Sequence, residues 1–169
     1  RHAEAGERLR EICAGPQADA ESWFFLGALS GMQADAAGAE NCFRKALVLT
    51  PGFLPARFNL GIALRDQGRL DEARAELEAV VAAQPGNAEA YNALGYVYVR
   101  LERSGDAERC FRAALASNPA FPEALTNLGN VLASRERWSE GVDFYRRALQ
   151  VAPGYADAAL NLGRALVAQ

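Results

Sequence analysis

Apolar and small residues recur along the chain at an interval of 34 residues. A Leu-Gly pair stands five times at this spacing, at 26–27, 60–61, 94–95, 128–129 and 162–163, and prolines recur in phase at Pro51, Pro85, Pro119 and Pro153. With each period numbered from 1, starting at Ala20, position 20 is small (Ala39, Ala73, Ala107, Gly141) and position 24 is large and apolar (Phe43, Leu77, Phe111, Tyr145). Several residue types in phase indicate an internal structural repeat.

The pattern of each repeat predicts two antiparallel helices, which we call the first helix and the second helix of the repeat. In the third repeat we expect them near residues 88–101 and 105–117. Pro-Gly and Asn-Pro pairs end the second helices, and Asp71 and Ser139 are expected to begin two of them. A glycine inside a helix costs about 1 kcal/mol relative to alanine. Five such glycines therefore imply that the paired helices approach closely, with a small residue at position 20 opposite.

These residues carry a family resemblance. Tyr91-x2-Leu94-Gly95-x2-Tyr98, followed by Ala107-x3-Phe111 and Pro119, resembles the tetratricopeptide repeat (TPR) pattern of period 34. The first repeat departs from that pattern only at Ser30. The resemblance, to a bacterial-type TPR array, covers nearly the whole chain. It implies an all-α fold, a right-handed α-solenoid of stacked antiparallel helix pairs, whose first helices line a concave groove.

The repeat frame predicts one TPR domain over residues 1–169. Its parts are a lone second helix of a preceding repeat at 3–16, complete repeats at 20–53, 54–87, 88–121 and 122–155, and the first helix of an incomplete fifth repeat at 156–169. That last helix is expected to leave an apolar face of Leu160, Leu162, Leu166 and Val167. Either the array continues, or this face docks on another domain or on a second copy.

Amides occupy the first-helix positions that point into the groove in this family. Asn59, Asn127 and Asn161 stand at position 6, Asn130 stands at position 9 and Asn92 is shifted by one, whereas the first repeat has Phe25 at position 6. A carboxamide donates and accepts hydrogen bonds, so a row of them suits an extended peptide backbone. The partial row is similar to the asparagine ladder of O-linked N-acetylglucosamine transferases. The alternative is family background, since Asn-Leu-Gly is common in TPRs.

Aromatic, apolar and basic residues complete the predicted peptide-binding groove. They are Phe24, Phe58, Ile62 and Tyr96, with Arg65, Arg100 and Arg164 at the rim. Aromatic side chains beside arginine are typical of binding hot spots. The alternative for Phe24 and Phe58 is that the next repeat covers them.

The sequence offers no constellation for catalysis. His2 is the only histidine, no Cys or His cluster has zinc spacing, and no nucleotide-binding or calcium-binding motif is present. Cys13, Cys42 and Cys110 lie in apolar helical surroundings, which favours buried reduced thiols over disulfides. We therefore expect no enzyme activity from these residues, no catalytic residue, no metal and no cofactor.

Charge disfavours nucleic acid as a partner. The net charge is −3, and the arginines of the second half alternate with Asp and Glu, a pattern of paired charges on a helical surface. The carboxylate clamp of TPR co-chaperones is also missing, because first-helix position 2 carries Glu21, Pro55, Glu89, Glu123 and Asp157. We expect no binding of chaperone C-terminal tails.

The sequence thus predicts a protein–protein interaction scaffold that holds an extended peptide or partner segment in its groove. The alternatives are the recruiting region of a larger glycosyl-, sulfo- or methyltransferase, and end-to-end self-association through apolar solenoid ends. No stretch reaches the ~18 apolar residues of a membrane span. We expect a cytoplasmic protein, with a periplasmic or membrane-anchored parent left open.

Overall fold

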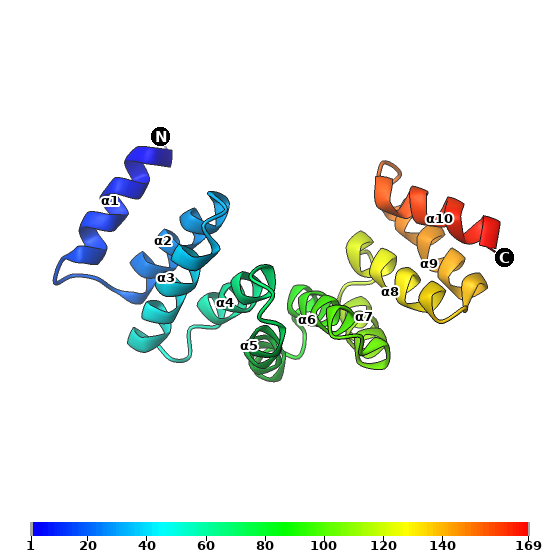
Figure 1. Ribbon diagram of the computed structural model, residues 1–169, viewed down its shortest axis with the longest axis horizontal. Coiled ribbons are helices and arrows are strands. Elements are labelled where there is room, and N and C mark those ends of the chain that lie inside the picture. Colours follow the sequence, from blue (N-terminus) through cyan, green and yellow to red (C-terminus); the bar gives the residue numbers. More distant parts are fainter. Residues whose placement is uncertain (1, 169) are drawn as a thin grey trace. The chain divides into compact units, whose positions relative to one another are not determined.

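The computed structural model describes residues 2–168, with side chains from Gly6 onward, and consists there of helices joined by short turns (Figure 1). The predicted all-α fold of stacked helix pairs is confirmed. The first helices of the repeats are α2 (Ala20–Met32), α4 (Leu54–Asp66), α6 (Ala88–Arg100), α8 (Pro122–Ser134) and α10 (Ala156–Ala168). The second helices are α3 (Ala36–Leu49), α5 (Leu70–Ala83), α7 (Ser104–Ser117) and α9 (Trp138–Val151), and α1 (His2–Ala14) precedes them all.

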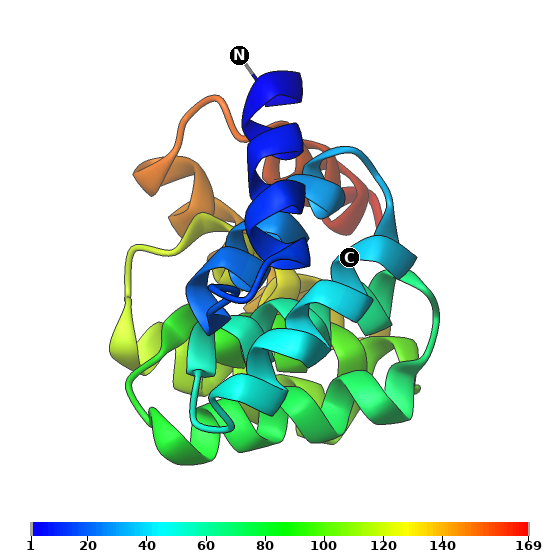
Figure 2. The ribbon, with the colours of Figure 1, turned by 90° about the vertical axis from the view of Figure 1, so that its left-hand side faces the viewer.

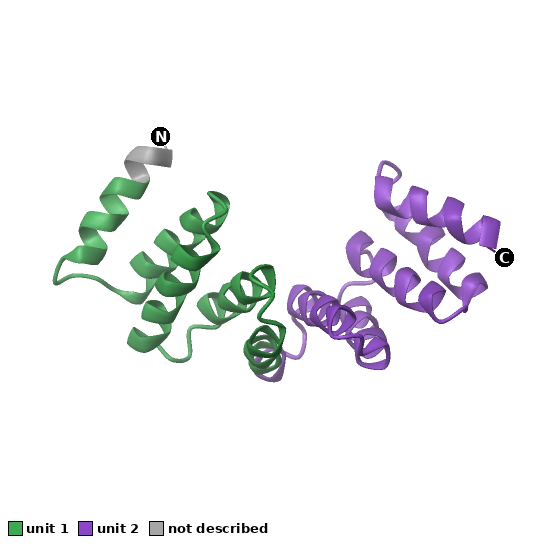
Figure 3. Ribbon diagram, viewed as in Figure 1, with its two compact units in different colours: residues 1–80 green, residues 81–169 purple. Residues whose placement is uncertain are grey.

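The chain divides into two compact units, residues 1–80 and 81–169 (Figure 3). In the first unit α1 packs on α2, α2 on α3 and α3 on α4 (Figures 1 and 2). In the second unit α6 to α9 each pack on the next helix, and α8 also contacts the other two first helices, α6 and α10. Contacts between neighbours in sequence are the signature of a repeat protein.

The recurring glycines make room for the large residue at position 24 of the same repeat. A Cβ built on Gly95 would lie 2.6 Å from Cε1 of Phe111, and one built on Gly129 would lie 2.5 Å from Cε1 of Tyr145. Phe43 and Leu77 cover Gly27 and Gly61 in the same way. The large side chain, rather than the small residue at position 20, is thus the main neighbour of the glycine in the four complete repeats. Gly141 at position 20 approaches the backbone of Gly129 instead.

The turn from first to second helix repeats the same backbone geometry four times. Ala34, Glu102 and Glu136 adopt φ of 60°, 59° and 61°, and Gly68 adopts 78°. In each turn the next residue donates to a carbonyl five residues back, as Arg137 N does to Leu132 O at 3.0 Å. This is the Schellman end of a helix, which needs one residue in the left-handed region.

Left-handed backbone at a residue other than glycine predicts a stability effect. Glu136→Gly is expected to raise the free energy of unfolding by about 0.5–1 kcal/mol, because the left-handed penalty of the side chain exceeds the entropy that glycine adds to the unfolded chain. Gly68→Ala is expected to lower it by about 1 kcal/mol. Urea unfolding followed by circular dichroism checks both, and a loss of stability in Glu136→Gly would contradict this account.

Two predicted helix starts were wrong. Asp71 and Ser139 lie inside α5 and α9, which begin one residue earlier. In each turn the residue with left-handed backbone is followed directly by the N-cap residue of the next helix. Before α5 and α9 this N-cap residue is an arginine, which is Arg137 in the case of α9. The guanidinium of Arg137 donates to Glu140 at 2.7 and 2.8 Å, and Arg69 and Glu72 repeat this arrangement before α5. Arginine with an acid three residues on therefore replaces the expected small polar cap.

Buried thiols and the last helix were predicted largely correctly. All three cysteines are free and buried. On α10, Leu160, Leu166 and Val167 are exposed as expected. Leu162 is not part of that exposed face, because it packs against Val142 and Tyr145 of α9. The side chains of His2 and Ala5 lie outside the described residues.

Candidate functional site

Four amides of the second unit form two hydrogen-bonded pairs between first helices. Asn127 Nδ2 of α8 donates to Asn92 Oδ1 of α6 at 3.0 Å, and Asn161 Nδ2 of α10 donates to Asn130 Oδ1 of α8 at 2.9 Å. We call these four residues the amide row. Asn130 is exposed, and the other three are partly exposed. The structure thus brings together four of the predicted groove residues.

Tyr145 of α9 is hydrogen-bonded to Asn130 of the amide row. Its hydroxyl donates to Asn130 Oδ1 at 2.8 Å, and only 2% of its surface is exposed. Burial raises the pKa of Tyr145 to about 12, so the hydroxyl keeps its proton at physiological pH. The second acceptor lone pair of Asn130 Oδ1 is thereby used, which fixes the orientation of that amide.

Each pair keeps at least one donor group and one acceptor oxygen for a ligand. Among the described residues, no hydrogen bond uses Nδ2 of Asn92 or Asn130, or Oδ1 of Asn127 or Asn161. A peptide unit needs this combination, an N–H donor for its carbonyl and an acceptor for its own N–H. The internal bonds hold the amides in place before a ligand arrives, which lowers the entropic cost of binding.

Tyr96 and Arg100 follow Asn92 on the same stripe of α6, at intervals of four residues. The Tyr96 ring is 39% exposed and the Arg100 side chain is exposed. On α10, Arg164 is exposed three residues after Asn161. An aromatic ring and two cations thus lie on the helices that carry the amides.

The predicted residues of the first unit form a different surface. Asn59 Nδ2 donates to Pro55 O of its own helix at 2.9 Å. Phe25 occupies the corresponding position on α2, so the first unit offers no amide there to pair with. Asn59 and Ile62 line a hollow of about 620 Å³ between α2, α3 and α4.

The remaining predicted residues of this unit are less available. Phe24 is half buried, with ring centroids of Phe25, Phe43 and Phe53 at 5.5, 6.0 and 5.3 Å. Phe58 is also half buried. The Arg65 side chain pairs with Asp66 at 2.7 Å. These three residues therefore have internal packing or pairing roles as well.

Six arginines of the second unit are paired with acids, and Glu108 alone binds three of them. Glu108 of α7 accepts from Arg112 on its own helix at 2.9 Å, and from Arg135 at 2.6 Å and Arg137 at 3.0 Å in the turn after α8. The sequence predicted pairs within helices. It missed that Glu108 ties one repeat to the next, an arrangement that Glu40 and Arg69 repeat in the first unit at 2.6 Å.

This cluster predicts a pH-dependent contribution to stability. Burial raises the pKa of Glu108, but hydrogen bonds from Arg112 and Arg137 and their charges lower it by more, so the pKa lies below its usual value. A lowered carboxyl pKa stabilises the fold at pH values above the unfolded pKa, about 4.3, and this stabilisation is lost as the pH falls through the folded pKa.

Glu108→Gln is therefore expected to lower the free energy of unfolding by about 1–2 kcal/mol at pH 7, since three guanidinium groups lose a carboxylate that is 13% exposed. The loss should shrink at pH 3. Urea unfolding at both pH values is the measurement. Glu89→Gln, on the exposed surface of α6, is the control with little expected effect. An equal loss for Glu108→Gln at both pH values would contradict the assignment.

Metal-binding clusters and membrane spans are both missing from the described part of the chain. Among these residues, no three His, Cys, Asp or Glu side chains are grouped so as to hold a metal ion. None of the helices within residues 2–168 has the length and apolar character needed to cross a membrane.

Comparisons with known proteins point to one family. Two family models, both described as tetratricopeptide repeat, match residues 32–96 and 92–156 and together span well over half of the chain. No match was found among curated protein sequences.

Several solved structures have similar folds. PilF of Pseudomonas aeruginosa is 20% identical with a TM-score of 0.86, covering 99% of this chain and 76% of that one. A thermophilic TPR protein of Thermus thermophilus is 24% identical with a TM-score of 0.77, covering 99% and 91%. YrrB, a TPR protein with an unusual peptide-binding site, is 23% identical with a TM-score of 0.77, covering 96% and 84%. At these identities the likeness concerns the fold.

Proposed function

Because the chain belongs to the tetratricopeptide repeat family, we propose that it is a protein-interaction scaffold whose second unit holds an extended segment of a partner protein along the amide row. The fold of this family is generally a non-catalytic scaffold for protein–protein interaction. The observation that carries the finer proposal is the pairing of Asn92 with Asn127 and of Asn130 with Asn161, which leaves at least one donor group and one acceptor oxygen on each pair.

The mode of binding follows from the chemistry of these groups. The free Nδ2 groups of Asn92 and Asn130 would donate to backbone carbonyls of the partner, and Oδ1 of Asn127 and Asn161 would accept from its N–H groups. Backbone hydrogen bonds do not depend on the partner's sequence. Tyr96, Arg100 and Arg164 supply side-chain selectivity, for aromatic or acidic groups.

The test removes the donors while keeping the internal pairs. Asn92→Asp and Asn130→Asp retain the Oδ1 atoms that accept from Asn127, Tyr145 and Asn161. The control pair, Asn118→Asp and Gln150→Glu, makes the same chemical change and the same change of charge at exposed amides elsewhere in this unit. Circular dichroism and thermal melting confirm that each variant is folded.

A phage-displayed library of random peptides supplies the probe. Peptides selected on the original chain are expected to bind the Asn92→Asp/Asn130→Asp variant with affinity about tenfold weaker or worse, because each lost hydrogen bond contributes about 0.5–1.5 kcal/mol and the new carboxylates repel carbonyl oxygens. The control pair should bind with unchanged affinity. Selected peptides that bind both variants as well as the original chain would refute the role of the amide row.

A further inference from the structure

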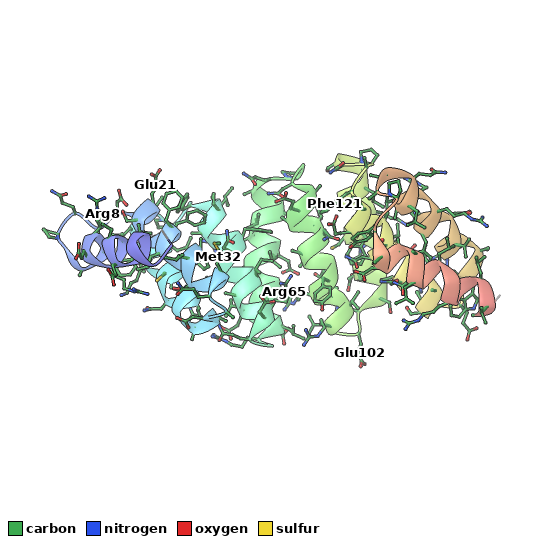
Figure 4. All side chains as sticks on the ribbon, turned by 90° about the horizontal axis from the view of Figure 1, so that it is seen from above. Arg8, Glu21, Met32, Arg65, Glu102 and Phe121 are labelled. Atoms are coloured by element: carbon green, nitrogen blue, oxygen red, sulfur yellow. The ribbon has the colours of Figure 1, made fainter. Side chains whose placement is uncertain are left out.

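The first unit carries a hollow of about 620 Å³ that the amide row does not use. Its walls come from α2, α3 and α4 and are mainly apolar, with Ala28, Met32, Phe43 and Ile62 among the lining residues. The Met32 side chain is 74% exposed at its edge, in view in Figure 4. An exposed large apolar side chain beside a concave apolar surface is typical of a binding site, and methionine adapts to partners of different shape.

The charged side chain among the residues that line the hollow is an acid. Among the described residues that line it, Asp66 is the only charged one. Arg65 holds Oδ1 of Asp66, at 2.8 Å from its Nε, whereas no hydrogen bond within the described part of the chain uses Oδ2. The Asp66 side chain is 53% exposed.

The backbone at two helix ends adds partial negative charge beside the Asp66 carboxylate, of which Oδ1 is paired with Arg65. Gly31 and Met32 end α2 and Asp66 ends α4, so both helices direct their C-terminal ends toward the hollow. The C-terminal end of a helix carries partial negative charge and favours cations. α3 begins at the hollow with the opposite polarity, but the Asp35 carboxylate already accepts from Gly38 N in its first turn at 2.9 Å.

We propose that this hollow binds a large apolar side chain of a partner protein that is followed directly by lysine or arginine. The apolar side chain enters between Ala28, Phe43 and Ile62, and Met32 closes over it. The cation lies against Asp66 Oδ2 and the helix ends. The Asn59 amide is oriented by the hydrogen bond that its Nδ2 donates to Pro55 O, and its Oδ1 accepts a backbone N–H of the same segment. The site is separate from the amide row in residues and in chemistry.

Met32 is the only methionine of the chain, so its methyl group gives a single, assigned signal in a ¹³C-methyl-methionine sample. The probes are three capped Gly-Ser peptides that differ at two central residues: Leu-Lys, Leu-Glu and Ser-Lys. We expect the Leu-Lys peptide to shift the Met32 signal saturably, with affinity at least fivefold tighter than Leu-Glu. The Ser-Lys peptide should give no saturable shift, because it lacks the apolar side chain.

Two variants separate the parts of the proposal. Asp66→Asn is expected to bring the affinities for Leu-Lys and Leu-Glu within twofold of each other. Ala28→Leu, which fills the hollow, should abolish the saturable shift, and Ala116→Leu on the exposed surface of α7 is its matched control. Asn92→Asp/Asn130→Asp should respond as the original chain does, so failure of the amide row and failure of the hollow are told apart. Equal affinity for Leu-Lys and Leu-Glu in the original chain, or no response to Leu-Lys, would overturn the proposal.

Discussion

Gly129→Ala is expected to lower the free energy of unfolding by about 1–3 kcal/mol, although alanine is the better helix former by about 1 kcal/mol. The added methyl group would lie 2.5 Å from Cε1 and 2.9 Å from Cδ1 of Tyr145. The ring has little freedom to move, because it is buried and its hydroxyl donates to Asn130. Relief of the clash must therefore shift α9 away from α8 or break that hydrogen bond.

Gly163 provides the matched control for this substitution. It occupies the same position of the fifth repeat, but a Cβ built on it meets nothing within 4 Å. Gly163→Ala is expected to raise the free energy of unfolding by up to about 1 kcal/mol through helix propensity alone. Urea unfolding of the two variants should thus give changes of opposite sign. Destabilisation of similar size in both would mean that the ring at position 24 is not the cause.

The fold was predictable because its causes recur in phase. The Leu-Gly pairs and the position-24 residues mark the same helix contact four times, and the prolines mark the end of each second helix. The periodic pattern therefore predicts the all-α stack of helix pairs. The starts of α5 and α9 were predicted wrongly because two local signals compete there. Asp71 and Ser139 are good caps by residue type, but the left-handed residue three positions earlier fixes where the turn ends.

The sequence predicted which residues form the candidate site, but it did not predict the hydrogen bonds between them. The helical spacing places Asn92, Asn127, Asn130 and Asn161 on one face of their helices. Which amide pairs with which depends on the separation of helices about 34 residues apart, as for Asn127 and Asn92, and on side-chain torsion angles. The role of Tyr145 was missed for the same reason, since its position in the repeat indicated only an apolar core residue. The signal in the sequence was tyrosine at position 24, where two other repeats have phenylalanine, because its hydroxyl needs a hydrogen-bond partner when it is buried.

Phe111→Ala is expected to lower the free energy of unfolding by about 3–5 kcal/mol, the usual cost of emptying a fully buried aromatic site. The Phe111 side chain has 0% of its surface exposed and lies over Gly95. Phe144→Ala, at a half-buried position on α9, is the control and should cost much less, because the ring there is already partly in contact with water. Equal losses in the two variants would contradict the packing described for Phe111.

The loss of Phe111 should also reverse the effect of a methyl group at position 95. In the original chain Gly95→Ala is expected to be destabilising by about 1–3 kcal/mol, because its Cβ would lie 2.6–2.9 Å from three atoms of the Phe111 ring. In the Phe111→Ala background the same methyl group enters the cavity that the ring has left and adds helix propensity. Gly95→Ala is then expected to stabilise by up to about 1 kcal/mol. A double-mutant cycle by urea unfolding measures this coupling, and additive effects would show that Gly95 is needed for some reason other than the ring.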